Sequence, residues 1–163
     1  MLGVLAATAR GAGEPILSEV TRALQARGLR VVGALREPAD PSGEMRLRLL
    51  PAGEVVGISQ RLGAGASRCR LDPDGLERAV AAGLARLAAE GADVVIVNKF
   101  GKQEAEGRGF RTLIAEALAA GIPVLTSVAP EQSDAFARFA EGLAEPVPSQ
   151  TEAALAWCLN AAT

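Results

Sequence analysis

Uninterrupted apolar runs alternate along the chain with stretches whose apolar residues recur every three to four positions. The runs predict strands buried on both faces, as in a parallel sheet, over residues 2–7, 29–35, 93–97 and 122–128. The helical spacing predicts helices over residues 15–27, 73–90, 107–120, 131–139 and 151–160. Asp72 is the expected N-cap of the second helix, and Pro15 fits the first position of the first helix.

A β-hairpin is predicted between the second strand and the second helix, because residues 45–50 alternate Arg with Leu and a second run follows at 55–59. Strands that otherwise alternate with helices predict an α/β fold with three layers and a mainly parallel sheet. We expect one domain over residues 1–163. Ligands bind such sheets beyond the carboxyl ends of the strands, which selects residues 8–15 and 98–108.

The composition excludes several kinds of catalysis. The chain has no His and no Tyr, and only two Lys against fifteen Arg. A His-based triad, a His metal site and Tyr acid–base chemistry are therefore excluded. Any acid–base chemistry must come from Asp, Glu, Cys, Lys or bound water.

Charge and hydropathy narrow the expected partners. The net charge is -2 and aromatic residues make up 3% of the chain, so neither a basic stripe nor a base-stacking platform for nucleic acid is expected. No apolar run reaches the roughly 20 residues of a membrane helix, and no basic segment precedes the first apolar run as in a secretory leader. Two cysteines in such a chain indicate reduced thiols, and we expect a cytoplasmic protein without membrane insertion.

Residues 8–15, Thr-Ala-Arg-Gly-Ala-Gly-Glu-Pro, occupy the place of a phosphate-binding loop between a strand and a helix. That loop requires G-x-x-x-x-G-K-[ST]; here Gly13 is kept, but Glu14 stands where Lys belongs and Pro15 where the magnesium-binding hydroxyl belongs. A carboxylate in a first helical turn occupies the field that a phosphate would use. We interpret the segment as a degenerate phosphate loop, with an ordinary strand–helix turn as the alternative. The candidate ligand-binding residues are Arg10, Gly11 and Gly13.

Both lysines lie within residues 98–104, Asn-Lys-Phe-Gly-Lys-Gln-Glu. Two ammonium groups at the mouth of a parallel sheet predict an anion site, and a solvated, salt-bridged loop is the alternative. If the protein is an enzyme, Glu104 is the candidate that orients water. The segment is also similar to the N-K-x-D guanine motif of GTPases, but Gly replaces its Asp. The candidate ligand-binding residues are Asn98, Lys99, Gly101 and Lys102.

A third candidate is a thiol. Cys69 lies between Arg68 and Arg70, whose charges lower the pKa of a thiol when their heads approach the sulfur. A reactive or ligating Cys69 is one interpretation, and a packed thiol is the other. Cys158, beside Trp157 on an apolar helix, is expected to be buried. Two distant thiols do not form a metal site, so no metal is expected.

The segments 28–33, 69–72 and 97–104, in this order around the hairpin, resemble a bacterial family of unknown function. The resemblance covers nearly the full chain and implies a P-loop NTPase-like fold and a link to molybdate metabolism, because members are often encoded beside molybdate-transport genes. The layout is also similar to small nucleoside-triphosphatases whose strand end reads roughly D-E-x-G-x-x-E. By that similarity, Asn98 replaces the magnesium-associated Asp and Lys99 replaces a catalytic acid, while Gly101 and Glu104 are kept.

The charge is thus reversed in both loops, and a direct contact between Glu14 and Lys99 is a further hypothesis. We favour a non-hydrolytic protein that binds a nucleotide or an oxyanion such as molybdate and has a regulatory role. An NTP hydrolase with a rearranged phosphate site is the alternative, with Arg10 and the lysines neutralising the phosphates. A structural subunit that forms a homo-oligomer is the third interpretation.

Overall fold

A mainly parallel sheet forms the centre of the molecule in the computed structural model, which describes residues 1–6, 11–38, 41–61 and 69–163. Within these residues the sheet has seven strands in the order β4-β3-β2-β7-β8-β1-β9. The strands β2, β7, β8, β1 and β9 are parallel, and β3 and β4 extend the sheet as an antiparallel hairpin. Their bounds are β1 Leu2–Leu5, β2 Val31–Arg36, β3 Arg46–Leu50, β4 Val55–Gly57, β7 Val94–Phe100, β8 Val124–Val128 and β9 Ala144–Val147.

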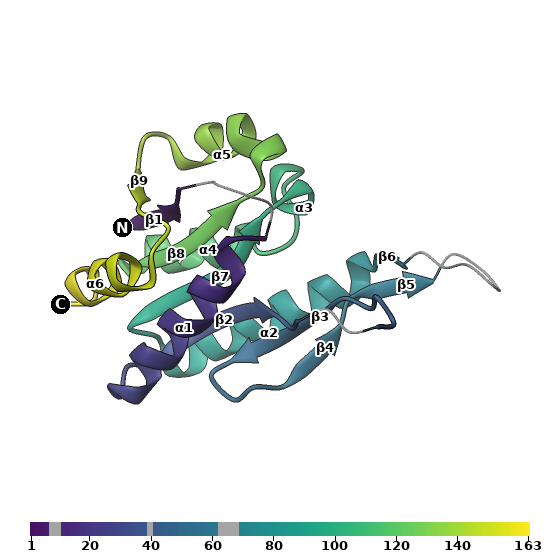
Figure 1. The fold of residues 1–163 in the computed structure, drawn as a ribbon, viewed down its shortest axis with the longest axis horizontal. Coiled ribbons are helices and arrows are strands. Elements are labelled where there is room, and N and C mark those ends of the chain that lie inside the picture. The colour runs from purple at the N-terminus through teal and green to yellow at the C-terminus, as the bar shows by residue number, and fades with distance from the viewer. Residues whose placement is uncertain (7–10, 39–40, 62–68) are drawn as a thin grey trace.

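Helices cover both faces of this sheet, which makes three layers (Figure 1). One face packs against α1 and α6, and the other packs against α2, α4 and α5. The helices are α1 Gly13–Ala26, α2 Pro73–Glu90, α3 Lys102–Ala105, α4 Arg111–Ala119, α5 Ser133–Ala140 and α6 Thr151–Ala161, with a 3-10 turn, η1, at Pro130–Gln132. The predicted α/β fold, with its three layers and its hairpin insertion, is confirmed.

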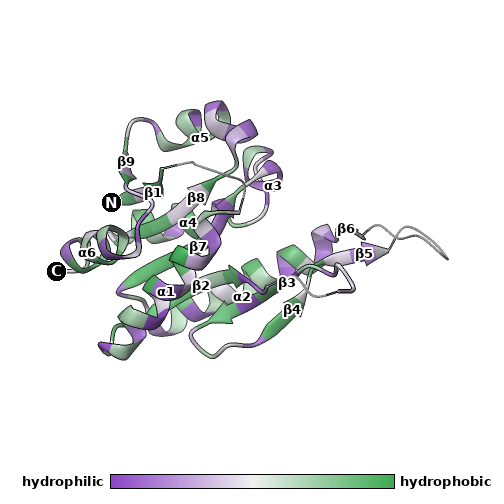
Figure 2. Cartoon of the chain, in the orientation of Figure 1, coloured by the Kyte–Doolittle hydropathy of each residue, from purple (hydrophilic) through white to green (hydrophobic). Residues whose placement is uncertain are grey.

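The sequence pattern accounts for most of these elements. In β7 the residues Val94 and Ile96 lie in the core under α1, whereas Val95 and Val97 lie in the core on the other face, so the strand is apolar on both sides. Asp72 caps α2 as expected, because its side chain accepts a hydrogen bond from the N–H of Asp74 at 3.1 Å. Figure 2 shows the apolar strands in the middle of the molecule and polar residues on the outer helical surfaces.

Three elements differ from the prediction. The predicted strand over 55–59 is divided into β4 and β5 (Ser59–Arg61), and β5 pairs with β6 (Cys69–Leu71) in a separate ribbon that projects from the body (Figure 1). The helix predicted within residues 107–120 is α4, Arg111–Ala119, but the short α3 before it was not predicted. β9 was not predicted, because an edge strand with Glu145 and Pro146 lacks the apolar run of a buried strand.

Candidate functional site

The carboxyl ends of β7, β8 and β1 lie side by side, and the first turn of α1 packs against two of them. A Cβ atom built on Gly13 would lie 3.3 Å from Leu5 Cδ1 and 3.3 Å from Ser127 Cβ, so this turn lies close to the ends of β1 and β8. The chain leaves β1 toward α1 on one face, whereas it leaves β8 toward α5 on the other. Such a divergence of neighbouring connections is where open α/β sheets bind ligands.

Asn98 connects three strands at this edge. Its Oδ1 atom accepts a hydrogen bond from the backbone N–H of Arg36, at the end of β2, at 3.2 Å. Its backbone carbonyl accepts a hydrogen bond from the Ser127 hydroxyl, in β8, at 2.7 Å. The side chain is 9% exposed. Asn98 therefore fixes the ends of β2 and β8 relative to β7.

Glu104, at the beginning of α3, is buried, with 5% exposure. Its Oε1 atom accepts a hydrogen bond from the N–H of Gly101 at 2.9 Å, and its Oε2 atom accepts one from the N–H of Phe110 at 2.9 Å. Burial raises the pKa of this carboxyl, while hydrogen bonds from Gly101 and Phe110 and the positive charge of Lys99 act in the opposite direction. Both carboxylate oxygens thus hold the backbone of the segment from 101 to 110.

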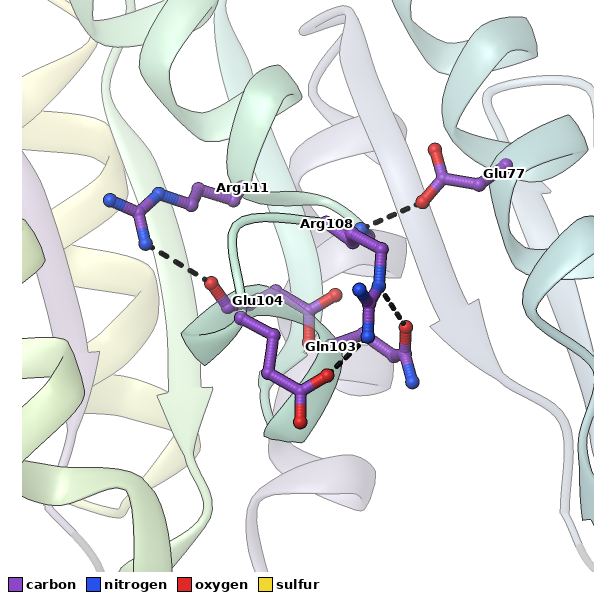
Figure 3. Close-up of polar contacts among 7 residues, drawn as sticks. Glu77, Gln103, Glu104, Arg108 and Arg111 are labelled. Carbon is purple, nitrogen blue, oxygen red and sulfur yellow. Dashed lines mark hydrogen bonds and ion pairs between the residues drawn. The ribbon is translucent and has the colours of Figure 1, made fainter.

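Contacts of Gly109, Glu77 and Arg111 also hold the segment around Glu104 in place (Figure 3). Gly109 has a φ of +62°, and a Cβ atom there would lie 1.8 Å from Glu104 Oε2, so only glycine allows the carboxylate to approach. The N–H of Gly109 donates to Glu77 of α2 at 2.9 Å. Arg111 donates to the backbone carbonyl of Glu104 at 3.3 Å, and its guanidinium lies 5.0 Å from the centre of the Phe139 ring. We call Glu104 and the N–H groups of Gly101 and Phe110 the carboxylate clamp.

The two lysines lie on either side of Gly101. A Cβ atom on Gly101 would lie 3.4 Å from Lys99 Cε and 3.6 Å from Glu104 Oε1, so the Lys99 side chain passes close to the clamp. Lys99 is half-buried and Lys102 is exposed. Within the described part of the chain, neither ammonium group forms an ion pair or a side-chain hydrogen bond.

The expected contact between Glu14 and Lys99 is not an ion pair in this structure, in which both residues are described. The physical reason lies in their surroundings. Glu14 lies in the first turn of α1, whereas the Lys99 stem lies over Gly101, where its charge acts on Glu104.

Several candidate residues lie outside the described residues or have side chains that the structure does not describe: Arg10, Arg68, Cys69 and Arg70. Gly11, with a φ of +78°, and Gly13 are described, but the phosphate loop as a whole stays a prediction. Cys158 is fully buried, as expected, and burial raises the pKa of its thiol to about 12. Among the described residues, no group of three or more His, Cys, Asp or Glu is placed to hold a metal ion.

Three contributors to the site were missed at the sequence level: Ser127, Glu77 and Arg111. The sequence did indicate Ser127, because Thr126 and Ser127 follow an apolar run and so lie near the carboxyl end of β8. Polar residues at the carboxyl ends of parallel strands lie where such sheets bind ligands. Thr126 donates to the Val97 carbonyl at 2.8 Å and so pairs β8 with β7 at the same level. Nothing in the sequence indicated Glu77, because Glu77 is an exposed residue of α2 and lies 32 positions before Gly109, to which it is hydrogen-bonded.

The arrangement of strands and helices recurs in a protein of known structure. A solved structure, that of THEP1 from the hyperthermophile Aquifex aeolicus, superposes with a TM-score of 0.64 over 93% of this chain and 90% of that chain, at 17% sequence identity. The family model described as "Protein of unknown function (DUF2478)" matches residues 2–157, and the chain belongs to this family. This membership confirms the resemblance to a family of unknown function.

A curated relative is also similar in sequence. The "Molybdenum import ATP-binding protein ModC 2" of Bradyrhizobium diazoefficiens is 37% identical over 148 residues, which cover 88% of this chain but 16% of that protein. The chain thus corresponds to a small part of this relative. No helix in the described residues is both long and apolar enough to cross a membrane.

Proposed function

We propose that this domain binds a nucleotide or a small oxyanion at the carboxyl edge of its sheet, without hydrolysing it by the usual magnesium-dependent route. In this proposal the bound anion contacts Lys99 and Lys102, and N–H groups come from Gly11, in the turn before α1, and from Gly13, the first residue of α1. Arg10 completes the set of candidate ligands. The domain then acts as a regulatory module in the cytoplasm.

The observation that carries this proposal is the unpaired charge of Lys99. The residue lies at the end of the central strand, is half-buried, and has no ion pair in the described part of the chain. A partly desolvated ammonium group interacts strongly with an anion, because the local dielectric constant is lower than in water. Phosphate, sulfate and molybdate offer the matching negative oxygens.

The geometry of Asn98 and Glu104 favours binding over hydrolysis. Asn98 carries no charge and its Oδ1 atom accepts an N–H of β2, and both oxygens of Glu104 accept N–H groups of the clamp. A magnesium-dependent triphosphatase needs carboxylate or hydroxyl oxygens that face the metal and the attacking water. Neither residue meets that requirement in this arrangement.

Support for a role in molybdenum import comes from the relative alone. The similar segment belongs to a protein named as a molybdenum import ATP-binding protein. We therefore propose molybdate as the oxyanion to test first, and a nucleotide as the second ligand.

Isothermal titration calorimetry tests the proposal with ATP and GTP, each with and without magnesium, and with molybdate, sulfate and phosphate. We expect one of these anions to bind the wild-type protein, and binding to weaken at least about tenfold in Lys99→Ala, because a charge-assisted contact is lost. Arg138→Gln, an exposed change on α5, is the matched control and should bind as the wild type does. Absence of binding by all five ligands would contradict the proposal.

Phosphate release from ATP and GTP by the same preparation distinguishes binding from hydrolysis. The proposal predicts no release above a protein-free control. Turnover that Glu104→Gln abolishes while the fold is retained would instead establish the rearranged hydrolase.

A further inference from the structure

A polar cavity lies on the α1 side of the sheet, beside the end of β2. It has a volume of about 290 Å³ and is enclosed by α1, the end of β2 and the neighbouring strand β3 (Figure 1 shows these elements side by side). Leu35 and Leu50, both part of the core under α1, form its apolar floor. None of the proposed nucleotide-binding residues lines it.

The walls of this cavity carry an excess of positive charge. Three arginines and one carboxylate line it, which gives a net charge of +2: Arg22, Arg36, Arg48 and Glu37. Arg48 and Glu37 form an ion pair. The pKa of Arg48 is raised mainly by its hydrogen bond to Glu37 and, to a smaller extent, by the negative charge of Glu37. Arg22 of α1 and Arg36 of β2 have no ion pair within the residues that the structure describes.

The two guanidinium groups that have no ion pair in the described residues come from different elements, and the backbone of one of the two residues is held in place. The backbone N–H of Arg36 donates to Asn98, which fixes the end of β2, and its side chain is half-buried. Planar guanidinium groups bind tetrahedral oxyanions through paired N–H donors. The nearby hydroxyl of Ser18 and the amide of Gln25 line the same cavity and add uncharged donors.

We propose that this cavity binds a small phosphomonoester dianion, with Arg22 and Arg36 on the phosphate and the apolar floor under the organic part. A phosphomonoester carries close to two negative charges at neutral pH, which matches the excess charge of the walls. An inorganic dianion would use the arginines but leave the Leu35 and Leu50 floor uncovered. The organic ester should therefore bind more tightly than the free ion.

Calorimetry with AMP, ribose 5-phosphate and inorganic phosphate tests this site. We expect at least one ester to bind the wild-type protein more tightly than inorganic phosphate. The affinity should fall at least about tenfold in Arg22→Gln and in Arg36→Gln, because each change removes a charge-assisted contact. It should also fall as salt is raised, since salt screens partly exposed charges.

Two variants make the test specific. Glu37→Gln releases Arg48 from its ion pair and raises the charge of the walls, so the ester should bind more tightly, which a structural defect would not produce. Arg138→Gln, an exposed change on α5, should leave ester binding unchanged, because Arg138 lines neither this cavity nor the proposed strand-edge site. The inference is overturned if Arg22→Gln and Arg36→Gln bind the ester as the wild type does, or if Lys99→Ala alone abolishes ester binding. The latter result would place the ester at the strand edge and support the proposed function instead.

Discussion

The carboxylate clamp allows the sharpest prediction, made by changing Glu104 to Gln. The carboxylate offers an acceptor oxygen to each of two N–H groups, at 2.9 Å from Gly101 and 2.9 Å from Phe110. Glutamine has nearly the same shape but only one carbonyl oxygen, so one buried N–H must face an NH₂ group. A buried donor left without an acceptor costs about 1–3 kcal/mol. At about 2–4 °C per kcal/mol for a chain of this size, the melting temperature should fall by roughly 2–12 °C.

The pH dependence of this loss has a definite sign. Burial raises the pKa of Glu104, so the folded protein binds this proton more tightly than the unfolded chain does. The resulting stabilisation is fully present below the ordinary glutamate pKa of about 4.3 and is lost as the pH rises through the raised pKa of the folded state. Gln does not titrate. The difference in stability between the wild type and Glu104→Gln should therefore shrink as the pH rises from about 4.3 through the raised pKa of Glu104.

Differential scanning calorimetry of both proteins at several pH values between 4 and 8 measures this difference. Glu106→Gln is the matched control, because Glu106 is exposed and lies two residues away, where it pairs only with Arg108 in the described structure. A change in an exposed pair is worth less than about 1 kcal/mol. Equal melting temperatures for Glu104→Gln and the wild type throughout would refute the clamp, and a deficit that grows with pH would contradict the raised pKa of Glu104.

Two further predictions concern the core. Gly33→Ala should prevent folding or leave the protein insoluble, because its Cβ atom would lie 1.9 Å from the Ile96 carbonyl oxygen. Gly28→Ala is the control, since Gly28 also has a positive φ but has open space around it. Chemical denaturation should show that Gly28→Ala lowers the free energy of unfolding by only about 1–2 kcal/mol. Cys158 should resist alkylation at pH 8 in the native protein and react after denaturation, because it is fully buried and burial raises the pKa of its thiol to about 12. Peptide mass spectrometry measures the labelling of Cys158. Rapid labelling in the native protein would contradict its burial.

The sheet could be predicted from the sequence because its central strands are apolar on both faces. Val94 to Val97 form an unbroken apolar run of strand length, and Gly28, Gly91 and Gly121 each lie three positions before the first residue of a parallel strand. β9 could not be predicted, since its pairing with β1 is made by backbone atoms and its side chains are mostly exposed. Backbone pairing at an edge leaves no periodic signal in the sequence.

The position of the candidate site followed from topology, whereas the role of its carboxylate did not. Asn98 and Lys99 had to lie at the sheet edge because they follow a buried parallel strand. Only under the alternative of an NTP hydrolase was Glu104 the candidate that orients water, and in the structure its oxygens accept the N–H groups of Gly101 and Phe110. In a capping box, a glutamate at N3, three residues after the N-cap, accepts a hydrogen bond from the backbone N–H of the N-cap residue. Gly101 is the N-cap of α3 and Glu104 is at N3, so the two residues have this spacing. Because α3 is only four residues long, its hydrophobic pattern did not reveal a helix, and without that helix the spacing had no structural meaning.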